Sequence, residues 1–116
     1  MPHFIIDCSQ SILTHHDEDT INEQIHHTAN ASGLFAEHEI KVRVNPFKTY
    51  LVGNKQTDFI HVFAHIMQGR STQQKAALSK AMVTKLSEMF PAVSNIAMNV
   101  ADFEQASYCN KSQLGL

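Results

Sequence analysis

Pro2 is the residue in this sequence whose type and position best suit it to chemistry, because it stands at the start of the mostly apolar segment 3–6. Removal of Met1, which a small second residue usually permits, would make Pro2 the terminus and its nitrogen a secondary amine. An α-amino group titrates at about pH 7.7–8.0, and burial or a nearby cation lowers that pKa. A base that titrates near neutrality suits proton transfer. Alternatively, a proline at this position only aids processing or protection of the terminus.

Three cations are candidate partners for such a base. Lys41 and Arg43 alternate with apolar residues and so share one face of an expected strand, whereas Arg70 follows an apolar run over residues 59–67. If the sheet brings Pro2 near them, the site holds one base and two or three positive groups. These cations would lower the amine pKa, bind an anionic substrate and stabilise the charge that grows on a carbonyl oxygen during enolisation. Taken singly, each is also explained as a solvated surface charge.

Eight histidines raise the question of a metal site, but their spacing disfavours one. The pairs 15–16 and 26–27 would lie about 16 Å apart along one helix. His61 and His65 would lie about 13 Å apart along one strand. No Cys/His spacing matches a zinc module. We therefore expect no bound metal.

Composition limits the class of protein. The 116 residues are 43% hydrophobic and 17% charged, which indicates a single globular domain over residues 1–116. A net charge of −2 without a basic run argues against a nucleic-acid partner. No apolar run approaches the roughly 20 residues of a membrane span, and the start lacks the pattern of a signal peptide. Cys8 and Cys109, far apart, indicate reduced thiols and a cytoplasmic location, with Cys8 more simply a small buried side chain than a nucleophile.

The first half of the chain predicts a strand, a helix and a second strand. The strand covers residues 2–8, and the helix starts between residues 13 and 17 and ends at Ala31, before Gly33. Leu13 lies on the apolar face of this helix, and Thr20 with Glu23 would form a capping box if it starts late. The second strand, residues 39–44, ends at Asn45-Pro46, because proline cannot continue a central ladder. A short extended piece follows over residues 47–52.

The second half repeats this order. The strand at 59–67 is apolar on both faces and should be covered on both. Ser71 and Gln74 form a capping box that opens a helix, which Pro91 ends, and a last strand covers residues 95–100. The chain thus reads as a pseudo-repeat of about 1–56 and 57–116, which predicts an α/β fold with a four-stranded mixed sheet and two helices on one face.

Two helices leave the other face of such a sheet uncovered. Among the residues expected on it are His61, Phe63, His65 and Met67, so a second copy of the chain is the simplest cover and a homo-oligomer is expected. The alternative is that segment 47–56 and the C-terminal tail cover this face.

The segment 2–9 (PHFIIDCS) resembles the start of 5-carboxymethyl-2-hydroxymuconate isomerases, in the tautomerase superfamily. The segment 40–44 falls at that family's spacing from the proline. The segment 69–75 is similar to the Gly-Arg-Ser helix opening of the related 4-oxalocrotonate tautomerases. The resemblance covers nearly the whole chain and its duplicated strand–helix–strand layout.

The resemblance implies a homotrimeric, cofactor-independent isomerase of the breakdown of aromatic compounds such as homoprotocatechuate. Pro2 would be the general base on an unsaturated 2-hydroxy or 2-keto diacid, and Arg70 would hold a substrate carboxylate. Lys41 stands where the family has an arginine, so it keeps the charge but loses the bidentate fork. Arg43 matches a second arginine and would compensate in substrate binding.

Two other readings stay open at this point. The scaffold would also suit hydration, dehalogenation or decarboxylation of an unsaturated acid, and the lysine at position 41 leaves room for this. The chain would otherwise be a non-catalytic, oligomeric module that binds small anions. While Met1 is attached, the nitrogen of Pro2 is an amide and cannot act as a base.

Overall fold

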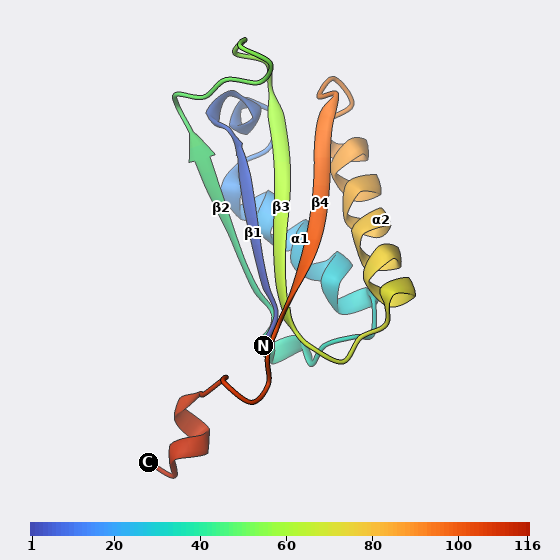
Figure 1. Ribbon diagram of the computed structural model, residues 1–116. Helices are drawn as coiled ribbons and strands as arrows, with labels where there is room; N and C mark the ends of the chain where they lie inside the picture. Colours follow the sequence, from blue (N-terminus) through green and yellow to red (C-terminus); the bar gives the residue numbers. More distant parts are fainter.

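The computed structural model describes residues 1–116 and shows four strands backed by two helices (Figure 1). The strands are β1 (His3–Ser9), β2 (Lys41–Phe47), β3 (Phe59–Met67) and β4 (Asn95–Phe103). The helices are α1 (Glu18–Ala31) and α2 (Thr72–Met89). Three short 3-10 helices complete the chain: η1 (Gln10–Thr14), η2 (Glu37–Glu39) and η3 (Lys111–Leu114).

The strands form one mixed sheet in the order β2-β1-β3-β4. β1 is parallel to β2, β3 is parallel to β4, and the central pair β1–β3 is antiparallel. The predicted fold class is confirmed. One consequence decides where a site can form: β1 and β2 begin at the same end of the sheet at which β3 and β4 finish.

The hydrophobic core lies between the sheet and the helices. Alternate residues of the central strands, such as Phe4 and Ile6 in β1 and Val62 in β3, have no exposed surface. They pack against the buried stripe of each helix, for example Ile25 in α1 and Met82 in α2. Burying each such side chain stabilises the fold by about 1.5–3 kcal/mol. This core fixes the strand ends, and so the side chains attached to them.

Capping residues set where the helices start. The carboxylate of Asp17 accepts a hydrogen bond from the Thr20 N–H at 2.8 Å, so α1 starts at Glu18. This bond also lowers the pKa of Asp17. The expected Thr20–Glu23 capping box is wrong, because Asp17 already caps this turn, and Leu13 lies in η1 instead. The Ser71–Gln74 capping box of α2 is confirmed.

Several strand boundaries differ from prediction. β1 is shifted by one residue at each end, and β2 starts at Lys41 because Glu39 lies in η2. β2 continues through Pro46 to Phe47, because β2 is an edge strand and the missing N–H of a proline can face solvent there. The expected extended piece 47–52 is absent beyond Phe47 apart from one bridge between Val52 and Lys55. β4 extends to Phe103, three residues past the predicted end, and pairs with β3 along its whole length.

The sheet face away from the helices is only partly covered. Its residues on β3 include His61 and Phe63, which are half-buried, and His65, which is exposed. The segment after β2 reaches this face at one end, where Tyr50 contacts the ring of Phe59 at 5.2 Å between centroids. The C-terminal segment leaves at the other end and projects away from the body (Figure 1). None of the helices is both long and apolar enough to cross a membrane.

Candidate active site

Pro2 lies at the end of the sheet where β1 and β2 begin. Its carbonyl accepts a hydrogen bond from the backbone N–H of Lys41 at 3.1 Å, and the parallel register then pairs His3 with Lys41. The Pro2 side chain is fully buried. The backbone of β2 therefore holds Pro2 in place, and Lys41 is its direct neighbour across the sheet.

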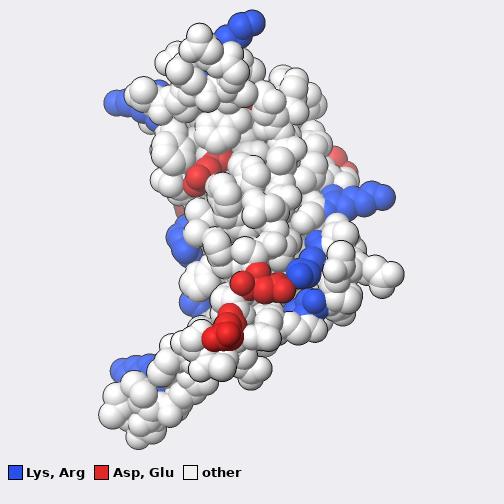
Figure 2. Space-filling view, in the orientation of Figure 1, with Lys and Arg blue, Asp and Glu red and all other residues white.

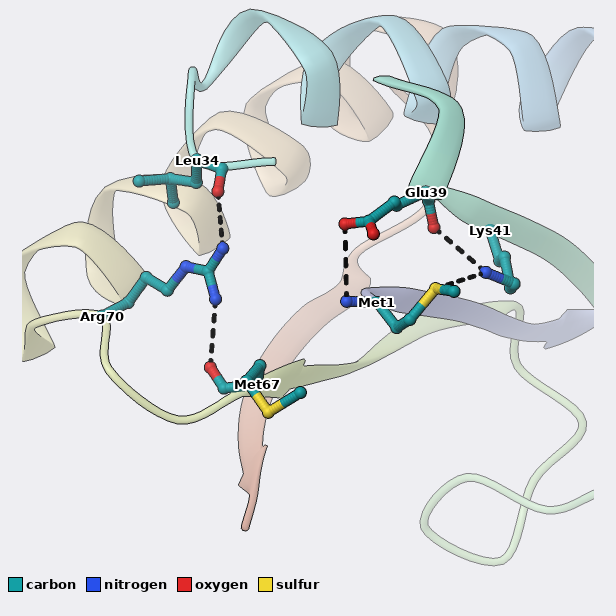
Figure 3. A network of polar contacts seen from close by, with 6 residues as sticks. All are labelled: Met1, Leu34, Glu39, Lys41, Met67 and Arg70. Carbon is teal, nitrogen blue, oxygen red and sulfur yellow. Dashed lines mark hydrogen bonds and ion pairs between the residues drawn. The ribbon is translucent and has the colours of Figure 1, made fainter. Parts of the chain in front are cut away.

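Met1 lies beside Glu39 and Lys41 (Figure 3). Its amine lies 3.9 Å from the Glu39 carboxylate. The Lys41 ammonium donates to the Met1 sulfur at 2.9 Å and to the Glu39 carbonyl at 3.2 Å. Only cations were predicted around this terminus, although Glu39 falls on the same face as Lys41 in the alternating sequence pattern and could have been recognised from it.

Arg70 approaches the same space from the link between β3 and α2. Its guanidinium donates to the carbonyls of Leu34 at 2.7 Å and Met67 at 3.3 Å, and lies 5.1 Å from the centroid of the Phe35 ring. These contacts fix the group in a half-buried position, on the opposite side of the Met1 amine from Lys41 (Figure 3). An arginine has five N–H donors, so some remain for a ligand.

A cavity of about 300 Å³ joins the terminus to Arg70. Met1, Glu39, Met67 and Arg70 form part of its lining, and the C-terminal segment supplies the rest: Gln105, Tyr108, Asn110 and Gln113. This segment was not predicted to be part of the site. The sequence does hold a capping box, Asn110 with Gln113, which orders η3, but such a box predicts a helical turn and not its position beside Arg70.

Arg43 lies outside this cavity. It shares the open sheet face with Lys41, and its guanidinium contacts His3 Nδ1 at 3.2 Å. Burial lowers the pKa of His3, and the positive charges of Arg43 and Lys41 lower it further. The structure thus brings Lys41 and Arg70 to the terminus and places Arg43 one step further along the sheet.

Charges of both signs meet at this end of the molecule. Figure 2 shows acidic and basic side chains next to one another where the C-terminal segment leaves the body, without a broad surface of one sign. The cavity lining includes one acid, Glu39, and one cationic side chain, Arg70. A small anion would therefore be drawn to one side of the cavity and repelled from the other.

Comparison with known proteins identifies the family. The family model described as 5-carboxymethyl-2-hydroxymuconate isomerase matches residues 2–112. A curated relative, the 5-carboxymethyl-2-hydroxymuconate Delta-isomerase of Escherichia coli, is 26% identical over 106 residues, which cover 90% of this chain and 84% of that protein.

Solved structures show the same fold. A 5-carboxymethyl-2-hydroxymuconate isomerase from Deinococcus radiodurans R1 matches with a TM-score of 0.82 at 18% identity, over 95% of this chain and 88% of that one. A wild-type fused 4-OT, described as an asymmetric trimer, matches with a TM-score of 0.79 at 11% identity, over 98% and 99% of the two chains. On the match over residues 2–112, this chain belongs to the 5-carboxymethyl-2-hydroxymuconate isomerase family and is an isomerase.

Proposed function

We propose that the protein catalyses a cofactor-independent 1,3-proton shift on an unsaturated 2-hydroxy or 2-keto diacid, such as 5-carboxymethyl-2-hydroxymuconate. Pro2 is the general base once Met1 has been removed. The observation that carries this proposal is the cavity that holds the terminus and Arg70 together, with the Lys41 ammonium against Met1. Met1 lines this cavity, so we expect its removal to expose the Pro2 nitrogen there.

The reaction needs one base and a means of holding negative charge. The free Pro2 amine takes a proton from the enol oxygen or from an allylic carbon, and the electron pair moves into the conjugated system. The resulting ammonium returns that proton to another carbon, so the enzyme ends unchanged. Positive groups near the carbonyl oxygen stabilise the dienolate that forms between these two steps.

Arg70 and Lys41 are suited to different tasks. The planar guanidinium of Arg70, fixed by two carbonyls, binds a substrate carboxylate through its remaining N–H groups. The Lys41 ammonium loses its sulfur contact when Met1 leaves and becomes available to the enolate oxygen. Arg43 binds the remote carboxylate of a longer diacid, for which it must give up its contact with His3.

We also propose that the chain acts as a homotrimer in the cytoplasm, in the breakdown of aromatic compounds such as homoprotocatechuate. Three structural neighbours are described as trimers of wild-type fused 4-OT. The half-buried residues Ile5 and Phe63 give the open sheet face an apolar strip that a second copy would bury. Cys8 and Cys109 are both free thiols, which fits a reducing compartment.

The test replaces the secondary amine of Pro2 with a primary amine. Protein whose intact mass shows that Met1 is absent is assayed by the ultraviolet band of the dienol of 5-carboxymethyl-2-hydroxymuconate. Pro2→Ala should lower kcat/KM by about 100-fold, because the primary amine of alanine is not held in place by a ring and a misplaced general base loses much of its effect. Pro91→Ala, at the far end of α2, is the matched control and should leave the rate unchanged. Equal rates for Pro2→Ala and wild type would refute the mechanism, and release of halide or carbon dioxide from other unsaturated acids would assign a different reaction.

A further inference from the structure

We infer that Glu39 is a positioning residue that raises the proton affinity of the terminal amine and so sets the pH at which the enzyme works. This inference rests on the proposed function, because it concerns the same base. It assigns a role to a residue whose charge opposes that of the cations around it.

The first observation is the contact itself. The Glu39 carboxylate lies 3.9 Å from the Met1 amine, and its side chain is 38% exposed. Both residues line the cavity, and no other carboxylate lines it. In the same short helix, η2, Glu37 points elsewhere and binds His26 Nε2 at 2.9 Å. The two acids therefore differ in partner although they are two residues apart.

The second observation is that the backbone keeps Pro2 close to Glu39 after Met1 is lost. Lys41 donates its backbone N–H to the Pro2 carbonyl, and its ammonium donates to the Glu39 carbonyl. The new terminus is one residue further along β1, a step of about 3.3 Å. The flexible Glu39 side chain can follow it over that distance and pair with the Pro2 ammonium.

A carboxylate changes what the cations would do alone. Lys41 and Arg70 lower the pKa of a nearby amine, whereas Glu39 raises it. Of the other groups around the terminus, His3 is neutral at pH 7, since burial and neighbouring cations hold its pKa below 6.5. Glu39 is thus the one group here that favours the protonated amine.

This balance matters to a base that must also return its proton. An amine surrounded only by positive charge would be free at neutral pH, but it would be a weak acceptor of a proton from carbon. Glu39 restores that affinity. Its charge also repels a substrate carboxylate, so a diacid is expected to bind with its carboxylates toward Arg70 and away from Glu39.

The experiment compares Glu39→Gln with Glu37→Gln, in protein shown by mass to lack Met1. In Glu39→Gln the acid limb of the kcat/KM profile, which reports the free enzyme, should move down by about 0.5–1 pH unit. KM for the diacid should also fall, because the repulsion is gone. Glu37→Gln should reproduce the wild-type profile, since its partner is His26 rather than the terminus.

A second measurement does not depend on turnover. The rate at which an alkynyl 2-keto acid labels the terminal amine, followed by intact mass against pH, reports the same pKa through the fraction of free amine. Its midpoint should shift down equally in Glu39→Gln. A midpoint within about 0.2 unit of wild type, or an equal shift in Glu37→Gln, would overturn the inference.

The two proposals fail separately. Full activity in Pro2→Ala would remove the proposed function while a shifted labelling midpoint would still support the Glu39–amine pair. An inactive Pro2→Ala with no shift in Glu39→Gln would keep Pro2 as the base and remove Glu39 from its environment.

Discussion

The two ends of the sheet occupy equivalent positions in the fold and have opposite chemistry. Pro2 immediately precedes β1 and Asp58 immediately precedes β3, and since these strands are antiparallel the two residues lie at opposite ends. At the first end, the Lys41 ammonium and Arg70 lie around a chain terminus. At the second, the Asp58 carboxylate accepts hydrogen bonds from the hydroxyls of Ser9 at 3.0 Å and Ser11 at 2.5 Å.

Both ends are hollow, so a cavity alone does not make a site. The Asp58 end has the larger cavity, about 540 Å³ against about 300 Å³ at the Pro2 end. Its carboxylate, however, is already held by two hydroxyls, and Ser9 in turn accepts the Phe59 N–H at 3.2 Å. Asp58 thus ties β1 to β3, whereas the Pro2 end combines a terminus with cations that have N–H donors to spare.

The largest effect that separates the two ends is expected from Arg70→Ala. Loss of its fork should lower kcat/KM by about 100–1,000-fold, as removal of one charge-stabilising donor does elsewhere. The kcat/KM of Arg70→Lys should lie between those of wild type and Arg70→Ala, because a lysine keeps the positive charge without the planar guanidinium fork. The matched change at the other end, Lys48→Ala, should have no effect, and circular dichroism with urea unfolding should show both variants folded. Similar losses at both ends would contradict the comparison.

Asp58→Asn should give the converse result. An amide accepts these hydroxyl hydrogen bonds less strongly than a carboxylate, so the free energy of unfolding should fall by about 1–3 kcal/mol in urea titrations. Ser11→Ala in the same background should add little, because it removes a bond already weakened. The kcat/KM of the folded protein should match wild type. If Asp58→Asn instead lost activity while its free energy of unfolding stayed the same, the catalytic site would lie at the Asp58 end.

Periodicity predicted most of the fold because burial follows it. The alternation in β3 and the apolar stripe of α2 identified elements that lie against the core. Boundaries were less certain where a local signal depended on context. Pro46 ends a central strand but not an edge strand, and strand order is not visible in the sequence. The start of α1 depended on a choice between Asp17 and Thr20 as the cap, which both residue types permit.

The candidate site was predictable only as far as the resemblance and the strand pattern reach. Pro2, Lys41 and Arg70 were named from the sequence, and their roles stay proposals. The distance between Glu39 and the terminus depends on the backbone path from η2 to β2. The periodicity of the sequence does not predict that path. The wall formed by Tyr108 depends on the path of a tail that follows the last strand, where residues have no pattern to place them.

A smaller effect is expected one step along the sheet from the Pro2 end. Burial and the charges of Arg43 and Lys41 hold the pKa of His3 below 6.5. A histidine whose folded pKa is lowered contributes stability above its unfolded pKa of about 6.5, and this stability is lost as the pH falls toward the folded value. Arg43→Ala should raise the His3 pKa in an NMR titration and make stability less sensitive to pH below 6.5. An unchanged His3 titration would show that Arg43 is too well solvated to matter.

The smallest expected effect concerns the two cysteine thiols, one of which lies toward each end of the sheet. Cys8, near the Asp58 end of β1, is fully buried, and this burial together with the charges of Asp7 and Glu18 raises its pKa to about 12. Cys109 is exposed in the C-terminal segment beside Tyr108. Since the thiolate is the reactive form, iodoacetamide at pH 8 should modify Cys109 in the native protein and Cys8 only after unfolding in urea, as peptide masses would show. If Cys8 in the native protein were labelled at a rate near that of Cys109, the Asp58 end would open in solution. Its hydrogen bonds would then fail to keep Cys8 buried.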